Sequence, residues 1–200
     1  MPGTERQAVP AERTAVDLST FDNGWYEPGR SLAVRLAWMA ANRAFLQTWF
    51  PWPNSLKARL LRAFGARVGR GVVLKNRVNV KYPWNLEIGD RSWIGEGVWI
   101  DSLAKVRIGA DACLSQNVMI ETGNHDWSVP SFDLMLGEVD IEDGAWAAVG
   151  SLLLPGSKLR SHAVLGAGST LSGDTETYGV YAGVPARKVK DRRIRQGRSE

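Results

Sequence analysis

The chain has 200 residues, of which 44% are hydrophobic, 23% are charged and 21 are glycine. This composition is typical of one folded domain with a small appendage, and it excludes a disordered or collagen-like chain. The single cysteine, Cys113, excludes an intramolecular disulfide framework, and the two histidines, His125 and His162, are too few for a Cys/His zinc module. The net charge of +4 is a mild bias toward anionic partners that identifies none of them.

Residues 1–30 are polar and turn-forming without a sustained period, so we expect an irregular N-terminal arm. The arm lacks the basic start, apolar run and small-residue cleavage site of a secretory signal, which favours a cytoplasmic protein. The most apolar stretch, residues 31–50, is interrupted by Arg35, Arg43 and Gln47. A helix that spans a membrane is therefore not expected.

Residues 31–66 are expected to form a helical N-terminal cap. Apolar residues recur at three- and four-residue steps from Ser31 to about Phe50, which predicts an amphipathic helix that stops at Pro51 and Pro53. The apolar positions expected in this helix are Leu32, Leu36, Met39, Phe45, Leu46 and Trp49.

A second short helix is expected to follow, with Asn54 or Ser55 as its N-cap and Gly65 at its end. One face of it would be apolar and the other basic. The apolar positions are Leu56, Leu60, Leu61 and Phe64, and the basic positions are Lys57, Arg59 and Arg62.

From Val68 onward the hydrophobic period changes to six. The positions with this period are Val68, Leu74, Val80, Ile88, Ile94, Ile100, Ile108, Leu114, Ile120, Ile141, Ala147, Leu153, Leu159, Leu165 and Leu171. All of them except Ala147 are Val, Ile or Leu. Neither a helix nor a simple hairpin sheet uses this period, whereas a solenoid with three short strands in each coil does. We therefore predict a mainly β protein with a β-solenoid over residues 67–179, whose stacked coils share one axial core.

The repeat is interrupted between Ile120 and Ile141, which are twenty-one residues apart where eight are expected. About thirteen residues, at about 124–138, are thus expected to leave the coil as an outward loop, with His125 at its start. The apolar residues of this loop are expected to cover a neighbouring coil or subunit and so to form a cleft.

Several stretches of this chain resemble the hexapeptide-repeat O-acetyltransferases. They are the coils themselves, PWNLEIGDRSWIGEGVWI, TGNHDW at the loop and VYAGVPARKVK near the end, and the resemblance runs from about Phe64 to Lys190. The closest likeness is to the colanic-acid biosynthesis branch of the maltose and galactoside acetyltransferase group, which also has a Trp-rich helical N-terminal segment. The resemblance implies a left-handed parallel β-helix, a homotrimer with sites between subunits, and acetyl-CoA as acyl donor, with no metal.

His125 matches the catalytic histidine of this family. Transfer of an acetyl group from a thioester to a sugar hydroxyl requires that the hydroxyl lose its proton, and imidazole is the side-chain base best suited to neutral pH. The expected reaction is direct attack by a hydroxyl of a sugar or lipid-linked sugar, with His125 as general base. The alternative for His125 is a surface histidine in a turn.

Three residues are candidates for contact with the acceptor. By analogy with the family, Asp101 would touch the acceptor, and the alternative is an exposed carboxylate at a corner of the coil. Asp126 would order the loop or the histidine, or is an ordinary turn residue. Trp127 would stack on a sugar face or pack against the next subunit.

For acetyl-CoA, the resemblance points to the last coils. Ala148, Ala167 and Gly168 would let the backbone approach the pantetheine arm closely, because small residues admit a thread-like group. Many relatives have Thr-Lys where this chain has Ser172 and Gly173. A phosphate-binding lysine is therefore missing at that position.

Residues 180–200 follow the repeat as a basic C-terminal tail. By the same resemblance, Arg187, Lys188 and Lys190 would hold the nucleotide phosphates of CoA as charge-assisted donors. The alternative for these three residues is a solvated terminal face.

Other functions remain to be weighed against acetyl transfer. A zinc-dependent, carbonic-anhydrase-like trimer needs three histidines and is excluded. A non-catalytic β-solenoid that binds sugars or has a structural role would bind no CoA. The N-terminal helices are interpreted as a cap on the core, with peripheral membrane contact as an alternative that is compatible with the enzyme. No nucleic-acid partner is expected, because the basic residues are dispersed and no recognition motif accompanies them.

Overall fold

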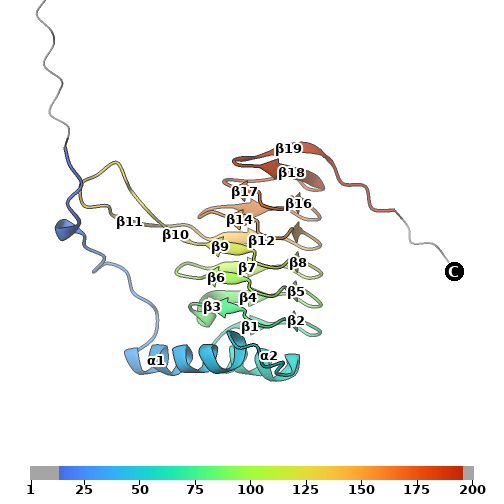
Figure 1. Cartoon of the computed structure of the whole chain (residues 1–200), viewed down its shortest axis with the longest axis horizontal. Helices are drawn as coiled ribbons and strands as arrows, with labels where there is room; N and C mark the ends of the chain where they lie inside the picture. Colours follow the sequence, from blue (N-terminus) through green and yellow to red (C-terminus); the bar gives the residue numbers. More distant parts are fainter. Residues whose placement is uncertain (1–13, 196–200) are drawn as a thin grey trace, which may run out of the picture.

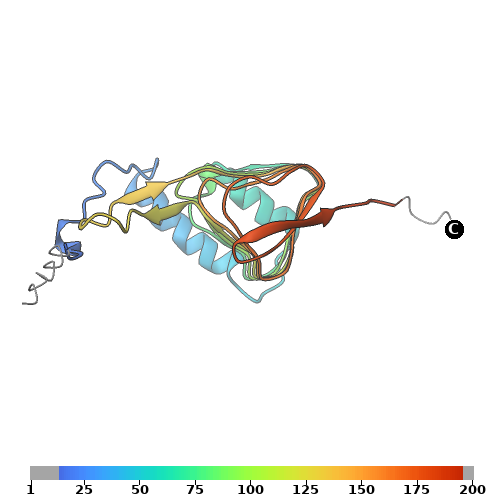
Figure 2. The same cartoon turned by 90° about the horizontal axis from the view of Figure 1, so that it is seen from above.

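The structure is a computed structural model that describes residues 14–195, and most of these residues form a β-solenoid (Figure 1). Each complete coil contributes one strand to each of three sheets, which we call A, B and C in the order in which the chain visits them. Seen along the axis, the coils superpose in a triangular outline (Figure 2). The turns between the sheets are called the A–B, B–C and C–A corners below.

Strands within each sheet are parallel, except that the last strand of sheet B is antiparallel. Sheet A contains β1 (Arg67–Val68), β4 (Leu86–Ile88), β7 (Val106–Ile108), β12 (Val139–Ile141) and β15 (Lys158–Leu159). Sheet B contains β2 (Val73–Leu74), β5 (Trp93–Ile94), β8 (Cys113–Leu114), β13 (Trp146–Ala147), β16 (Val164–Leu165), β18 (Gly179–Gly183) and β19 (Ala186–Asp191). Sheet C contains β3 (Asn79–Val80), β6 (Trp99–Asp101), β9 (Met119–Glu121), β14 (Leu152–Leu153) and β17 (Thr170–Leu171).

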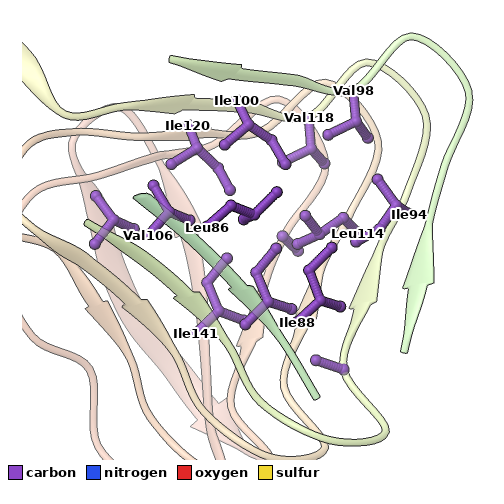
Figure 3. Close-up of a cluster of buried hydrophobic side chains, with 14 of the residues drawn as sticks. Leu86, Ile88, Ile94, Val98, Ile100, Val106, Leu114, Val118, Ile120 and Ile141 are labelled. Carbon is purple, nitrogen blue, oxygen red and sulfur yellow. The ribbon is translucent and has the colours of Figure 1, made fainter. Parts of the chain in front are cut away.

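The period-six positions form the axial core, as predicted. Val68, in the first coil, is 9% exposed, and the other fourteen positions are less exposed than that. Side chains from the three sheets meet along the axis, as Leu86, Ile94 and Ile100 do in Figure 3. Equivalent residues pair one coil apart, so that Ile88 is in register with Ile108, and Ile108 with Ile141. The repeat thus specifies both the core and the register of the sheets.

Two helices cover the first coil at the base of the solenoid (Figure 1). They are α1 (Leu32–Ala41), which continues as the π-helical segment η2 (Asn42–Leu46), and α2 (Asn54–Ala63). Short 3-10 turns occur at η1 (Leu18–Thr20) and η3 (Pro83–Asn85).

The apolar face predicted for the first helix is largely wrong. Leu32, Leu36 and Met39 are each more than half exposed. The buried residue of α1 is instead Trp38, whose indole Nε1 donates a hydrogen bond of 2.8 Å to the carbonyl oxygen of Val80. The helix is therefore oriented by a polar contact with the solenoid, which the spacing of apolar residues does not encode.

The second helix also differs from its prediction. Lys57, expected on the basic face, is 2% exposed, and its ammonium donates to the carbonyl oxygens of Leu74 and Lys75 and to Asn76 Oδ1. Burial is the main cause of the lowered pKa of Lys57. The N-cap is Pro53 rather than Asn54 or Ser55, and the Asn54 carboxamide oxygen accepts a hydrogen bond from the Leu74 amide.

The predicted excursion is an antiparallel hairpin of β10 (Gly123–His125) and β11 (Leu134–Leu136), which leaves the solenoid at the C–A corner after β9. The N-terminal arm lies beside this hairpin (Figures 1 and 2). The Asp17 amide donates a hydrogen bond of 2.9 Å to the Pro130 carbonyl oxygen. The arm is therefore attached to the loop that carries His125.

The last part of the solenoid is closed by a second hairpin. β18 extends sheet B beside β16, and β19 folds back on β18 antiparallel. Most of the described part of the predicted basic tail, residues 180–195, thus lies in sheet B. Residues 196–200 of the tail and residues 1–13 of the arm are outside the described residues. Within residues 14–195, no helix has both the length and the apolar character needed to cross a bilayer.

Candidate active site

His125 is the last residue of β10 and pairs with Leu134 across the hairpin. Its Nδ1 lies 2.8 Å from the carbonyl oxygen of Phe132. A carbonyl oxygen can only accept a hydrogen bond, so a neutral imidazole carries its hydrogen on Nδ1. The lone pair of the neutral ring is consequently on Nε2, which is the form needed for a general base.

Two aromatic rings hold the imidazole in place. The Phe132 ring is stacked on it, with a centroid distance of 4.4 Å and an interplanar angle of 10°. The Phe21 ring, from the N-terminal arm, lies at 5.7 Å and is tilted by 55°. Both contacts restrict the imidazole, so the arm takes part in shaping the site.

A cleft of about 550 Å³ lies beside His125. Its walls come from the arm, α1, the residues after β3 and the hairpin. Its lining includes the aromatic, cationic and titratable residues Phe21, Tyr26, Arg35, Lys81 and His125. Sequence reasoning identified only His125 among them, because the others belong to no repeat or motif; Arg35 was noted only as an interruption of an apolar stretch.

Asp101 lies near this cleft but outside its lining. Its carboxylate is 2.9 Å from the Lys81 ammonium and lines an adjacent cleft of about 570 Å³, which Lys81 also lines. Asp101 is in register with Glu121 on β9. Burial is the first cause that raises the pKa of Glu121, and the neighbouring Asp101 carboxylate is the second.

Asp126 and Trp127 lie on the outer part of the hairpin. The Asp126 carboxylate accepts hydrogen bonds from the amide and the hydroxyl of Ser128, which lowers its pKa and orders the turn. Trp127 is 79% exposed. Neither residue lines the cleft beside His125 within one chain.

The residues predicted to bind acetyl-CoA stack at a different corner. Ala148 follows β13, and Ala167 and Gly168 follow β16, so all three lie at the B–C corner in consecutive coils. The Gly168 amide donates a 2.9 Å hydrogen bond to the Val149 carbonyl oxygen, which joins the two turns. Gly168 has a φ of +63°, and a Cβ added there would meet no atom within 4 Å. Small residues thus occupy successive turns of this corner, beside the exposed side chain of Val149.

The basic residues of β19 differ in whether their charge is paired with a carboxylate. The Lys188 ammonium is 2.6 Å from Glu176 and 2.8 Å from Asp191, and these hydrogen bonds raise its pKa. Arg187 and Lys190 are exposed and form no ion pair with a described residue. Ser172 and Gly173 follow β17 at the C–A corner, so the missing lysine does not belong to the B–C corner.

The other two residues with potential chemistry are outside the cleft. His162 stacks on Tyr178 with a centroid distance of 4.7 Å, and its Nδ1 is 2.7 Å from the Ser161 hydroxyl. Cys113 is half-buried on the outer face of sheet B, and burial raises the pKa of its thiol. A raised pKa disfavours the nucleophilic thiolate, in agreement with a structural role.

A larger hollow, of about 1110 Å³, lies along the outer face of sheet A. Several of its charged side chains are paired across the strands: Arg107 lies 2.8 Å from Asp140, and Arg67 lies 3.3 Å from Glu87. This region is a ladder of ion pairs without a histidine, and we assign no chemistry to it.

Comparison with known proteins places the chain among acetyltransferases. It is 32% identical over 182 residues to a protein of Escherichia coli K12 named as the colanic acid biosynthesis acetyltransferase WcaF, covering 88% of this chain and 97% of that protein. The solved structure of a maltose O-acetyltransferase from Clostridium difficile 630 has a TM-score of 0.73 at 24% identity and covers 82% of this chain and 88% of its own. The hexapeptide-repeat acetyltransferase VCA0836 from Vibrio cholerae, solved with acetyl coenzyme A, has a TM-score of 0.73 at 17% identity, over 81% and 88% of the two chains. No protein-family model matches the sequence.

Fold and similarity together define an acyltransferase built on a left-handed parallel β-helix of hexapeptide repeats, which sets aside the non-catalytic solenoid. Within this class, the chain belongs to the family of the colanic acid biosynthesis acetyltransferase WcaF.

Proposed function

We propose that this protein is an acetyl-CoA-dependent O-acetyltransferase that acts on a sugar or lipid-linked sugar, with His125 as general base. The names of its relatives support the acyl group and the acceptor class. The observation that carries the role of His125 is the contact of its Nδ1 with the Phe132 carbonyl oxygen, because this contact leaves Nε2 unprotonated in the neutral ring.

In the proposed reaction, Nε2 of His125 takes the proton of an acceptor hydroxyl as its oxygen attacks the thioester carbon. A carbon–oxygen bond forms and the carbon–sulfur bond breaks. The imidazolium then returns the proton to the departing thiolate of CoA, so that His125 is regenerated. No covalent enzyme intermediate is required, in agreement with the half-buried position of Cys113.

The proposed site requires a second copy of the chain. His125 leaves the solenoid at the C–A corner, whereas Ala148 and Gly168 lie at the B–C corner. Sheet C separates these corners within one subunit. A homotrimer, in which each hairpin reaches the B–C corner of a neighbour, would bring base and donor together at three equivalent sites.

The outer face of sheet B provides a surface suited to this assembly. Trp93, Cys113 and Trp146 are in register on adjacent strands, and both tryptophans are exposed in the single chain. Aromatic side chains are enriched at the centres of protein interfaces. We expect these residues to become buried in the homotrimer.

The direct test of the base is the release of CoA from acetyl-CoA, followed with a thiol reagent against a panel of mono- and oligosaccharides. His125→Ala should reduce acceptor-dependent release at least a hundredfold, as expected for loss of a general base, while CoA binding persists. His162→Ala is the matched control and should retain full activity. Equal rates for the natural chain and His125→Ala would disprove the role of His125.

Mixed assemblies test the site between subunits. Ala167→Trp should block the B–C corner and should be inactive alone, as should His125→Ala. In trimers formed from equal amounts of the two variants, about one quarter of the interfaces would combine an intact His125 with an intact corner. Recovery of about that fraction of activity is expected, whereas no recovery would show that both elements act within one chain.

We also propose that the helical cap rests on the cytoplasmic face of a membrane that contains anionic lipid. Between Glu27 and Glu87 the chain has eleven Lys and Arg residues and no Asp or Glu. The exposed side of α1 carries Leu32, Leu36 and Met39, which share one helix face. Exposed apolar side chains within a cationic region are the combination that binds an anionic bilayer surface.

Vesicle flotation tests this contact. The full chain should float with vesicles of phosphatidylglycerol and phosphatidylcholine, and much less with phosphatidylcholine alone. The double variant Leu36→Ser/Met39→Ser should lose most of this binding, whereas Met135→Ser on the distant hairpin should not. Equal flotation of both variants, or none by the natural chain, would disprove membrane contact and leave the enzyme assignment intact.

A further inference from the structure

The charged side chains that line the cleft beside His125 are cationic. Two cationic side chains line it, Arg35 from α1 and Lys81 from the segment after β3, and no carboxylate is part of its lining among the described residues. The remaining lining side chains are aromatic, apolar or neutral. A cavity with this composition favours a ligand group of negative charge.

The two cations are not equivalent. The Lys81 ammonium is 2.9 Å from the Asp101 carboxylate, so much of its charge is already balanced. Arg35, in contrast, has no carboxylate within 4.0 Å among residues 14–195. Its Nε is buried and has no hydrogen-bond partner there.

An unpaired buried guanidinium nitrogen is costly in a folded protein, because it has lost water without gaining an acceptor. Arg35 also lines the cleft, and no ion pair with a described residue engages its guanidinium, so an oxyanion bound in the cleft would supply the counter-charge that the group lacks. Guanidinium groups bind phosphate and carboxylate oxygens through paired hydrogen bonds, which makes them suited to such a ligand.

We propose that Arg35 binds an oxyanion carried by the acceptor sugar, either a phosphate ester or a carboxylate, and so places a hydroxyl of that sugar next to His125. This inference rests on the proposed function, because it takes the reacting group to be a sugar hydroxyl that is acetylated next to His125. Arg35 is a binding residue in this scheme, and Lys81, held by Asp101, contributes to the positive field of the cleft.

Anion binding can be measured without knowledge of the natural acceptor. The full-length protein, with its donor site saturated by CoA, is titrated by calorimetry with inorganic pyrophosphate and, separately, with glucuronate. Pyrophosphate represents a phosphate ester, and glucuronate represents a sugar carboxylate. At least one probe should bind, and Arg35→Gln should weaken it roughly tenfold or more, as expected for one charge-assisted contact.

Two variants control this measurement. Arg59→Gln removes an exposed cation from α2 outside the cleft and should leave the affinity unchanged. Arg35→Lys retains the positive charge and should preserve part of the affinity, and thermal unfolding verifies that each variant is folded. The proposal is wrong if neither probe binds the natural chain, or if Arg35→Gln weakens binding no more than Arg59→Gln does.

Turnover separates this proposal from the proposed function. Glucose, glucose 1-phosphate and glucuronic acid are compared as acceptors, and Arg35→Gln should raise the KM of the charged sugars selectively. Acetylation of glucose alone, dependent on His125 and insensitive to Arg35, would overturn the anion site while the acetyltransferase stands. Loss of probe binding in Arg35→Gln, without acetylation of any acceptor, would support the anion site and count against the enzyme proposal.

Discussion

Ile100 in the solenoid is in register with Val80 and Ile120, its equivalents one coil below and one coil above. The residues around His125 come mainly from the arm, α1 and the hairpin, which do not recur among the described residues, and only Lys81, Tyr82 and Leu103 belong to coils. The first region is stabilised by many repeated contacts, each of which supports the next. The second depends on a few contacts that occur once.

If the proposed role of His125 is correct, stability and base catalysis reside in separate parts of the molecule. Substitutions in the axial core should act on the free energy of unfolding, and substitutions around the cleft should act on turnover. Failure of any prediction below would count against this separation of stability from catalysis.

The largest effect on stability is expected for Ile100→Ala. Ile100 is fully buried, and truncation of such a residue costs about 2–5 kcal/mol because a cavity replaces the lost methyl groups. Guanidinium unfolding, monitored by tryptophan fluorescence, measures this change. The exposed Trp127→Ala should change stability by less than about 0.5 kcal/mol, and a comparable loss in both variants would contradict the role of the core.

A smaller effect, on activity rather than stability, is expected for Phe21→Ala. The Phe21 ring lies next to the His125 imidazole, and its loss would let the imidazole move from the position that the proposed reaction requires. We expect kcat/KM to fall roughly tenfold while the unfolding midpoint barely changes. Trp25→Ala, an exposed aromatic residue on the same arm, is the control; if both variants retain full activity, the arm does not shape the site.

The smallest effect is expected for Glu121→Gln and depends on pH. Burial and Asp101 raise the pKa of Glu121 above its ordinary value of 4.5 in the folded state only. The folded chain therefore loses stability as the pH rises through this raised pKa. Glu121→Gln should be more stable than the natural chain at neutral pH by about a few tenths of a kcal/mol, since the side chain is partly exposed.

That advantage should vanish below the ordinary pKa, where Glu121 is protonated in both states. Urea unfolding at a series of pH values measures the difference, with Glu27→Gln, on the exposed part of the arm, as control. A stability gap that is constant with pH would show that the ionisation of Glu121 is not its cause.

The sequence predicted the solenoid because its signal is repeated. Each period-six position, Ile94 or Leu165 for example, faces the same axial environment, so the pattern accumulates over many coils. The outward excursion was predicted for the same reason, since a break in a regular repeat is itself a signal, but its hairpin pairing was not. His125 could be singled out because it stands at that break and in a recognisable motif.

The parts that escaped prediction depend on contacts between distant segments. Most residues of α1 are apolar on every side of the helix. The spacing of apolar residues therefore cannot tell whether the side of Leu36 or the side of Trp38 packs against the solenoid. Lys57 is charged in the sequence, but carbonyl oxygens at the start of the solenoid permit its burial. The hydrogen-bond partner of His125 is the main-chain carbonyl oxygen of Phe132. Every residue has such an oxygen, so the sequence does not reveal which one forms this contact.

The hairpin has a further consequence for how this scaffold acquires new chemistry. Val139, after the insertion, is in register with Val106 just as Val106 is with Leu86, although thirty-three residues separate the first pair and twenty the second. The coil therefore closes as if the thirteen additional residues were absent. The His125 imidazole and the Phe132 carbonyl beside it both belong to this insertion, so residues can be added or changed at this one corner while the register of the neighbouring strands is kept.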